Sequence, residues 1–299
     1  MGWSIGTGCQ RYFRGLFAVS VQEVDGQSGS RTLSWSEAND ANIQEYIIDR
    51  RYFGGSFEEM KRVDASEVAG SSLTVENLGV GAFEFRLRWV RENGSTASSP
   101  ERVRDTITVR DVSTTITGRD EQGRGTVDLS WTVPPGTSSD FLYRVERRTG
   151  EEGAFQPVAT VPQDGDASDE QSKQYTVKGQ TPGRYEYRVR AQDRAGNAVT
   201  SAAREAQIDF EGDVYALGPY PNPVRETASF DLTAREPQSV QVEVYNTLGE
   251  QVYAEQREVR AQDPTSLSID ASQWASGMYF LRLRGDGSVG QTKKMIVVQ

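Results

Sequence analysis

The chain contains one unit of about 100 residues twice. Four pairs of similar segments carry this repeat, centred on Trp35 and Trp131, Tyr46 and Tyr143, Phe57 and Phe155, and Phe83 and Tyr185. The offset between partners grows from 96 residues at the first pair to 102 at the last, and the extra residues fall where Gly, Ser, Asp and Gln cluster. Insertions in loops leave the strands in register. We therefore predict two copies of one domain, at residues 16–110 and 111–210.

Within each copy, apolar residues recur with a period of two and no stretch sustains a helical period. Tyr143 and Val145 fall on one face of a predicted strand, whereas Arg144, Glu146 and Arg148 fall on the other. Short alternating runs between turn residues are typical of antiparallel β-sandwiches. Each copy is predicted to fold as a sandwich of about seven strands.

Composition excludes several classes of function. The net charge is −10, which disfavours binding to nucleic acid or to anionic lipid. The chain has no histidine and a single cysteine, Cys9, so Ser-His-Asp and Cys-His catalysis, His-ligated metals and an internal disulfide are excluded. No run approaches the ~20 apolar residues of a transmembrane helix. We expect a non-catalytic protein without a cofactor or a metal ion.

The residues of the second copy carry a family resemblance. The "LSW" around Trp131 and the stretch "PGRYEYRVRAQDRAGNAV" resemble the fibronectin type III fold. The resemblance implies that Trp35 and Trp131 are core residues and that Tyr185 is the tyrosine corner, whose hydroxyl bonds to nearby backbone. The first copy has Phe83 at that position, so this bond should be missing there.

A proline-rich break separates the repeat from the last part of the chain. Tyr220, Pro221, Asn222 and Pro223 form the core of "LGPYPNPVRETASFDL". Proline fixes φ and disfavours helix in the preceding residue, so we interpret the segment 211–223 as a linker. Beyond it, alternating valines, a hairpin turn at "NTLGE" and the turns around Gly277 and "GDGS" predict a third, smaller β-sandwich at residues 217–299.

Four motifs of this third unit, in order, resemble the type A sorting domain of the bacterial type IX secretion system. They are YPNP, VYNTLGE, ASGMYFLRL and the terminal KKMIVVQ. The resemblance implies nine residues that mark the sorting signal: Tyr220, Pro221, Asn222, Pro223, Gly249, Gly277, Tyr279, Lys293 and Lys294. For the two glycines, a purely structural role at positions of positive φ is the favoured interpretation.

The resemblance also implies a route and partners. Such a domain directs a folded protein from the periplasm through the outer membrane, is recognised by the type IX machinery and is cut off by its sortase. The passenger is then attached to surface lipopolysaccharide or released. We place the cleavage between Ile208 and Leu217. The two modules are then spacer or binding units of a secreted or cell-surface adhesion or scaffold protein, with no nucleic-acid partner and no transmembrane segment.

Two other functions remain open at this stage. The start of the chain, an irregular segment at 1–15, shows no signal peptide, and "LFAVSV" is interpreted as a strand. The chain could therefore be the C-terminal portion of a larger secreted hydrolase, a peptidase or glycosidase, whose catalytic domain lies upstream. It could also be a glycan-binding surface protein, because arginines gather on one predicted face of each module: Arg51, Arg86 and Arg88, and Arg144, Arg148, Arg188 and Arg190.

Three smaller features have a simple structural interpretation. The arginines are predicted to form cross-strand salt ladders with Asp49, Glu84 and Glu146. The acidic run with Asp164, Asp166, Asp169 and Glu170 lacks the spacing of a complete calcium loop, and a solvated loop is favoured. The tripeptide Arg284, Gly285 and Asp286, which some integrin ligands use, is interpreted as a hairpin turn.

Overall fold

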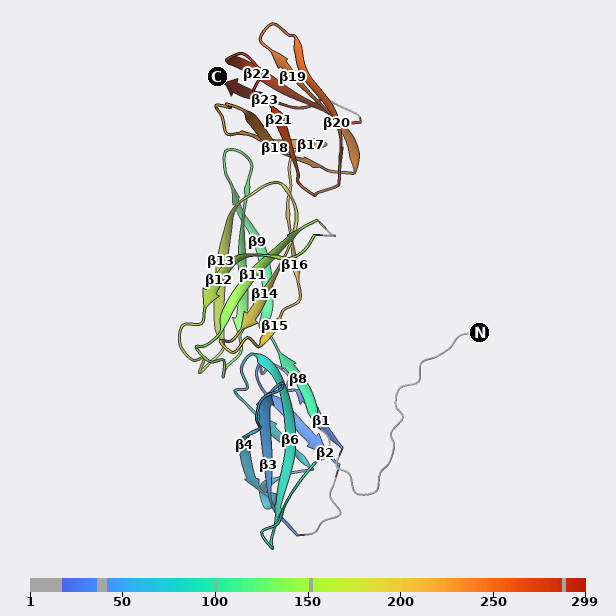
Figure 1. Cartoon of the computed structure of the whole chain (residues 1–299). Helices are drawn as coiled ribbons and strands as arrows, with labels where there is room; N and C mark the ends of the chain where they lie inside the picture. The colour runs from blue at the N-terminus through green and yellow to red at the C-terminus, as the bar shows by residue number, and fades with distance from the viewer. Residues whose placement is uncertain (1–17, 37–41, 100–101, 151–152, 287–288) are drawn as a thin grey trace, which may run out of the picture.

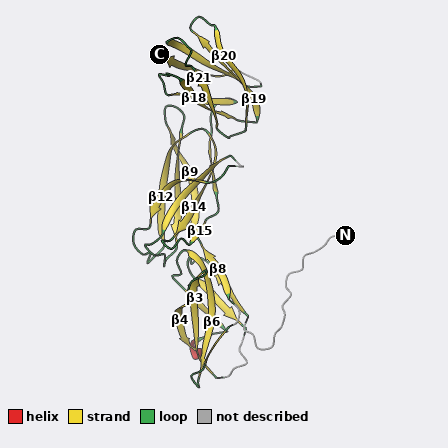
Figure 2. Ribbon diagram, viewed as in Figure 1, coloured by secondary structure: helices red, strands yellow, loops and turns green. Residues whose placement is uncertain are grey.

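The computed structural model describes residues 18–36, 42–99, 102–150, 153–286 and 289–299. Three β-sandwiches follow one another along an elongated rod, from the blue first module to the red C-terminal sandwich (Figure 1). Nearly all regular structure is strand, and the helix that is present is a single short turn, Ala65–Glu67 (Figure 2). The all-β prediction is confirmed. Cys9 and the predicted segment 1–15 lie outside the described residues.

The first module packs a three-stranded sheet, β1-β2-β5, against a sheet of order β4-β3-β6-β7, with β8 also paired to β6. The strands are β1 Val19–Glu23, β2 Arg31–Trp35, β3 Ile43–Tyr52, β4 Glu58–Asp64, β5 Ser72–Val75, β6 Gly81–Arg91, β7 Thr96–Ser98 and β8 Val103–Ile107.

The second module repeats this arrangement, with β13-β10-β9 against β12-β11-β14-β15 and with β16 also paired to β14. Its strands are β9 Arg110–Arg119, β10 Gly125–Val133, β11 Leu142–Thr149, β12 Gln156–Pro162, β13 Gln171–Gln180, β14 Gly183–Gln192, β15 Ala198–Thr200 and β16 Arg204–Ile208.

Both modules break their last strand in two, and a serine marks the break. The Ser99 amide donates to the Leu87 carbonyl, and the Ser99 hydroxyl accepts from the Leu87 amide. Ser201 makes the same two bonds with Val189. The serine side chain supplies the backbone acceptor that the interrupted ladder lacks. Each module therefore contains the seven predicted strands, with the last one divided into two segments, β7 and β8 or β15 and β16.

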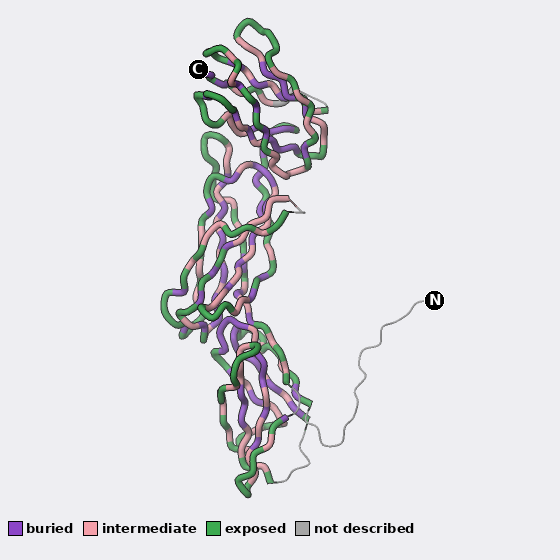
Figure 3. Tube along the Cα trace, viewed as in Figure 1, coloured by how far each residue is buried: buried purple, intermediate pink, exposed green. Residues whose placement is uncertain are grey.

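The alternating pattern places the core as the sequence indicates. In β10, Val127, Leu129, Trp131 and Val133 are buried and their neighbours are partly exposed. Trp131 is 1% exposed, and the corresponding Trp35 is 6% exposed. Continuous buried stretches run through the inside of each sandwich in Figure 3. Burial of large apolar side chains on both inner faces stabilises each module.

The C-terminal sandwich has sheets β17-β18-β21 and β20-β19-β22-β23. Its strands are β17 Val214–Tyr220, β18 Thr227–Ala234, β19 Gln238–Asn246, β20 Gln251–Val259, β21 Thr265–Asp270, β22 Gly277–Arg284 and β23 Val289–Val297. The sequence predicts a linker at 211–223, but Val214 and Ala216 are buried and pair with β18. The connection between the folded sandwiches is therefore shorter, at 209–213.

Candidate functional site

The proline segment and the end of the chain lie together. The Asn222 side chain accepts a hydrogen bond from the Ile296 amide at 3.0 Å. Val224 donates to the Ile296 carbonyl at 2.7 Å and accepts from the Val298 amide at 2.8 Å. The first and last predicted sorting motifs, 74 residues apart, therefore form one edge of the C-terminal sandwich.

The last residue is also fixed. The Gln299 side-chain amide donates to the carbonyls of Ala271 and Ser272 at 3.1 and 3.2 Å, and its backbone amide donates to the Ser276 hydroxyl at 2.9 Å. Chain ends are usually poorly ordered unless they are tied down in this way. The terminal signal is thus a structured surface.

The two terminal lysines point in opposite directions along β23. Lys294 is exposed, whereas Lys293 is half-buried with its ammonium 5.5 Å from the centre of the Tyr215 ring. Burial lowers the pKa of Lys293, because the charged form loses solvation. Opposite-facing neighbours are the rule in a strand, so the lysine pair presents a single exposed cation.

Lys293 and Tyr220 line the same cleft, of about 720 Å³, at the boundary between the second module and the C-terminal sandwich. Gln122 and Arg124 of the second module line its other side. Burial, together with a hydrogen bond and charge from Asp231, raises the pKa of Tyr220 well above its ordinary value. Residues from both ends of the sorting domain therefore meet here.

The remaining motif residues shape turns and a strand start. Gly249 has a φ of +82° in the β19–β20 turn, as a left-handed position requires. Gly277 is different: it lies in β22 without positive φ, and an added Cβ would meet nothing closer than 3.9 Å. The positive-φ explanation for Gly277 is therefore wrong. The Tyr279 hydroxyl donates to the Ala275 carbonyl at 2.9 Å.

This last bond has a counterpart in the second module. The Tyr185 hydroxyl donates to the Thr181 carbonyl at 2.7 Å, again four residues upstream. The first module has Phe83 there, packed against the ring of Tyr52 at 4.9 Å between centroids. A phenyl ring lacks the donor, so apolar packing replaces the hydroxyl bond at that corner.

The arginine faces of the two modules form ion pairs. Arg86 and Arg88 both contact Asp49, at 2.5 and 2.6 Å. Arg51 pairs with Glu84 in the first module, as do Arg148 with Glu186 and Arg188 with Glu146 in the second. These contacts are the predicted salt ladder for five of the seven arginines, whereas Arg144 and Arg190 lie opposite each other on β11 and β14.

Sequence reasoning missed an aromatic residue within each ladder. Phe57 lies between Arg51 and Arg86, whose guanidinium carbons are 4.5 and 4.2 Å from its ring centre. Phe155 lies in the same way against Arg148 and Arg188, at 5.0 and 4.0 Å. The repeat already aligned these two phenylalanines, and that alignment was the available signal. Two cation–π contacts to one ring hold the arginines of each ladder in place.

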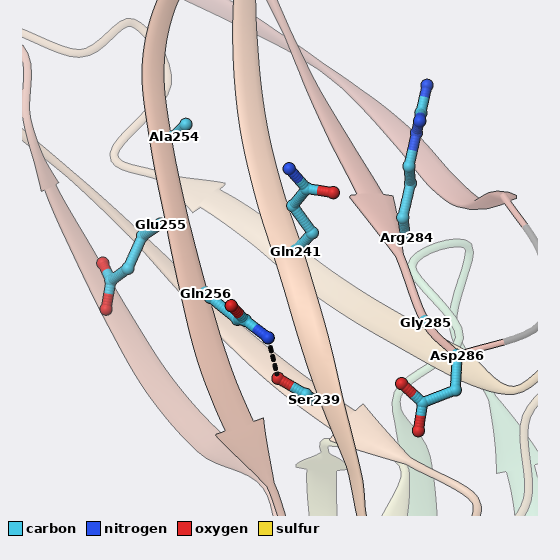
Figure 4. A pocket seen from close by; sticks show the side chains of 8 residues that line it. All are labelled: Ser239, Gln241, Ala254, Glu255, Gln256, Arg284, Gly285 and Asp286. Carbon is cyan, nitrogen blue, oxygen red and sulfur yellow. Dashed lines mark hydrogen bonds between the residues drawn. The ribbon is translucent and has the colours of Figure 1, made fainter.

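The acidic run and the Arg-Gly-Asp tripeptide do not form converging sites. Asp166 accepts from the Ser139 amide, Asp164 pairs with Lys173, and the Ser28 hydroxyl of the first module donates to Glu170. Within the described residues, no three acidic, Cys or His side chains are grouped as metal ligands. The tripeptide borders an open pocket of about 450 Å³, where Arg284 and Asp286 point apart and Gln256 bonds to Ser239 (Figure 4).

Comparisons with known families and structures bear on the whole chain. Residues 219–299 match the family model described as a secretion system C-terminal sorting domain. Among curated proteins, none matches the chain. Among solved structures, the FN1–FN3 domains of chicken CNTN1 align with 17% identity and a TM-score of 0.26, covering 94% of this chain and 97% of that one.

Two further structures are similar at the same level. Dimeric latent PorU from Porphyromonas gingivalis aligns with 15% identity and a TM-score of 0.27, over 95% of this chain and 34% of that one. A tetra-tandem repeat in the extending region of a large adhesion protein aligns with 19% identity and a TM-score of 0.27, over 95% and 74%.

The paired sheets of both modules, with the corner tyrosine of the second, define two fibronectin type III-like sandwiches in tandem. The sandwich that follows them is a C-terminal sorting domain of the type IX secretion system. The protein is therefore exported by that system to the cell surface or the extracellular space, and the type IX machinery recognises its C-terminal domain. Among the described residues, none lies in a helix with both the length and the apolar character needed to span a bilayer.

Proposed function

We propose that this chain is a non-catalytic secreted protein whose C-terminal domain is removed after export by cleavage within residues 209–213. The two fibronectin type III-like modules are then the functional part, a spacer or a binding unit outside the cell. The observation that carries this proposal is the exposure of the short connection between the second and third sandwiches.

The connection is an accessible segment between two buried strand ends. Ile208 at the end of β16 is 0% exposed and Val214 at the start of β17 is 2% exposed. Between them, Asp209, Glu211, Gly212 and Asp213 are exposed. A protease needs accessible, unpaired backbone, so cleavage at this connection is favoured over cleavage within either sandwich.

The connection is nevertheless held in place by the sorting domain. The Arg235 side chain donates to the carbonyls of Phe210 and Gly212 at 2.8 and 3.3 Å, and its amide donates to the Asp213 carbonyl at 2.8 Å. The Phe210 ring packs against Tyr215, with centroids 5.8 Å apart. Processing is therefore expected to require release of these contacts.

Two features support a non-catalytic role without glycan binding: the chain has no histidine, and the arginines of the two faces form ion pairs. Free cations would favour binding of acidic glycans, but five of the seven arginines on these faces already contact carboxylates at 2.5–2.8 Å, and only Arg144 and Arg190 lie opposite another arginine. Spacing or protein binding is thus the better-supported role of the modules.

Mass spectrometry of the native protein from outer-membrane and culture fractions tests the proposal. We expect the mature C-terminus to fall between residues 209 and 213. Peptides from Leu217 onward in the mature surface protein would contradict cleavage. Peptides from upstream of Met1 would instead make the modules a spacer for another domain.

A further inference from the structure

The outer face of the β20-β19-β22-β23 sheet carries a row of apolar side chains. We name it the apolar strip and define it as Tyr245, Val252, Met278, Phe280 and Ile296. Val252 and Met278 are each 37% exposed and Ile296 is 36% exposed. Leu248, at the tip of the adjoining β19–β20 hairpin, is 82% exposed. Of the seven large apolar side chains exposed among the described residues, three belong to the strip and a fourth is Leu248 beside it, so more than half of them gather at this face.

Strand register makes the strip continuous. Tyr245 of β19 lies opposite Phe280 of β22, and Met278 of β22 lies opposite Ile296 of β23. Tyr279, Leu281, Met295 and Val297, which alternate with these residues, are buried. The strip therefore faces solvent and is no part of the core.

The corresponding faces of the two modules differ. In the first module, the central strands β3 and β6 carry Asp49, Arg86 and Arg88 as ion pairs. In the second module, β11 and β14 carry Glu146 and Arg188. The same sheet position thus bears extended salt ladders in the two modules, whereas in the C-terminal sandwich a single Glu243–Arg284 pair adjoins the apolar strip. Continuous apolar surface on a soluble domain marks an interaction site.

The charges beside the strip identify the partner's character. Arg282, Arg284 and Lys294 lie on the same outer face of β22 and β23, while Glu243 of β19 is buried and 3.6 Å from Arg284. This basic surface belongs to a chain with a net charge of −10. Electrostatic complementarity therefore calls for a partner with carboxylates around an apolar surface.

We propose that the apolar strip docks on a protein of the export machinery whose binding surface is apolar and rimmed by carboxylates. The inference rests on the export role of the C-terminal domain and assigns the residues that carry recognition. A protein fits better than an anionic membrane, because carboxylates lie among the cations of this face: Glu243 is 3.6 Å from Arg284, and Glu250 follows the exposed Leu248.

The test uses the full-length protein in the bacterium that makes it. We would compare Met278→Glu/Ile296→Glu, Met278→Lys/Ile296→Lys and Met278→Thr/Ile296→Thr with the native chain, and measure the extracellular and periplasmic fractions. Matched controls are Phe53→Glu and Leu142→Glu, at exposed apolar positions of the first and second modules that are 55% and 42% exposed. Thermal unfolding of each purified variant verifies its fold.

We expect the Glu pair to reduce export at least tenfold, the Thr pair to reduce it less, and the Lys pair to be exported better than the Glu pair. The controls should be exported normally. Normal export of a folded Glu pair would overturn the proposal, and equal loss with Lys and Glu would overturn the carboxylate rim. If the Glu pair does not fold, normal export of the Thr pair overturns the proposal instead.

Two further measurements separate the possible failures. A chain that ends at residue 213 tests the sorting role itself: its export would contradict that role, whereas its retention beside normal export of the Glu pair would contradict the strip alone. Co-sedimentation of the native protein with phosphatidylglycerol vesicles, lost in the Glu pair, would assign the strip to a membrane and overturn the protein partner.

Discussion

The two junctions of the rod are built in different ways. Between the first and second modules, Val80 is 0% exposed and packs, with Ala82, into the core of the second module. The Gly79 amide donates to the Pro135 carbonyl at 3.0 Å and the Val80 amide to the Thr137 hydroxyl at 3.1 Å. This junction combines apolar burial shared with the second module's core and hydrogen bonds between the two backbones, and the Ser28 hydroxyl also donates to Glu170 across it.

The junction between the second module and the sorting domain is polar. The Thr233 hydroxyl donates to the Pro182 carbonyl at 2.8 Å, and the Arg184 amide donates to the Gln262 carbonyl at 2.6 Å. The Tyr215 hydroxyl donates to the Gln122 carbonyl. The sorting domain builds its core from its own residues, and clefts of about 720 and 440 Å³ border the contact.

We expect the first junction to be the more stable contact and the second junction to open more easily. Burial of shared apolar side chains stabilises an interface because exposure of those side chains to water is unfavourable. A hydrogen bond exchanged for water contributes only about 1 kcal/mol net. The first junction therefore joins two modules into one unit, while the second is the weaker contact and lies beside the connection at which we propose cleavage.

The largest expected effect comes from Gly136→Ala in the first junction. Gly136 has a φ of +83°, and an added Cβ would lie 1.9 Å from the Asn77 carbonyl oxygen. Strain and clash together should cost about 3 kcal/mol and separate the modules. Small-angle scattering should show a more flexible rod, and thermal unfolding a lower transition.

Gly54→Ala is the matched control for this change. Gly54 has a φ of +85° with nothing within 4 Å of an added Cβ, so it should lose only about 1 kcal/mol and leave the rod shape unchanged. Equal effects of the two substitutions would mean that backbone contact does not hold the first junction.

Thr233→Val should weaken the second junction by about 1–2 kcal/mol, because it leaves the Pro182 carbonyl without its buried donor. Limited proteolysis should then cut the connection at 209–213 faster. Thr227→Val, at an exposed position of the same strand, is the control. Unchanged cutting in Thr233→Val would show that this bond does not hold the domains together.

Arg235→Ala should have a smaller effect. It should lower the free energy that holds the 209–213 connection in place by about 0.5–1 kcal/mol, because Arg235 is exposed and its backbone bond to Asp213 survives. Cutting at 209–213 should be several-fold faster while the unfolding temperature stays constant. Arg225→Ala, at another exposed arginine, should change neither. A lower unfolding temperature without faster cutting would contradict the role of Arg235 in shielding the connection.

The alternation of apolar residues predicts the inside of each sandwich but not what its ends contact. Trp35, Trp131 and the strand faces follow from a local period of two, which packing in any sandwich must satisfy. The cleft around Tyr220 and Lys293 could not be predicted in this way, because loops of a different module form half of it.

The proline segment shows a related limit. Its residues predict a break, yet part of it continues β17, since an edge strand tolerates proline where no ladder bond is needed. The arginine ladders were predictable from opposite charges at cross-strand positions. The position of the phenylalanines between them depends on the path of a neighbouring strand, which only the repeat alignment indicated.

The smallest expected effect concerns Lys293, which borders the second junction. Burial lowers its pKa below the ordinary 10.5, so at neutral pH the folded protein holds a charge that the unfolded chain solvates better. Lys293→Met should therefore stabilise the protein at pH 7, by less than about 1 kcal/mol because the ammonium is half exposed. The difference in unfolding free energy between the variant and the native protein should shrink as the pH rises through the lowered pKa toward 10.5, because folded Lys293 then loses its charge.

Thermal unfolding of both proteins across this range measures the difference. Lys294→Met, at the exposed neighbour, should change nothing. A variant that is more stable yet poorly exported would show that the sorting domain keeps a buried cation for recognition at the expense of its own stability. A less stable variant would instead make Lys293 a structural part of the junction, through its contact with the Tyr215 ring.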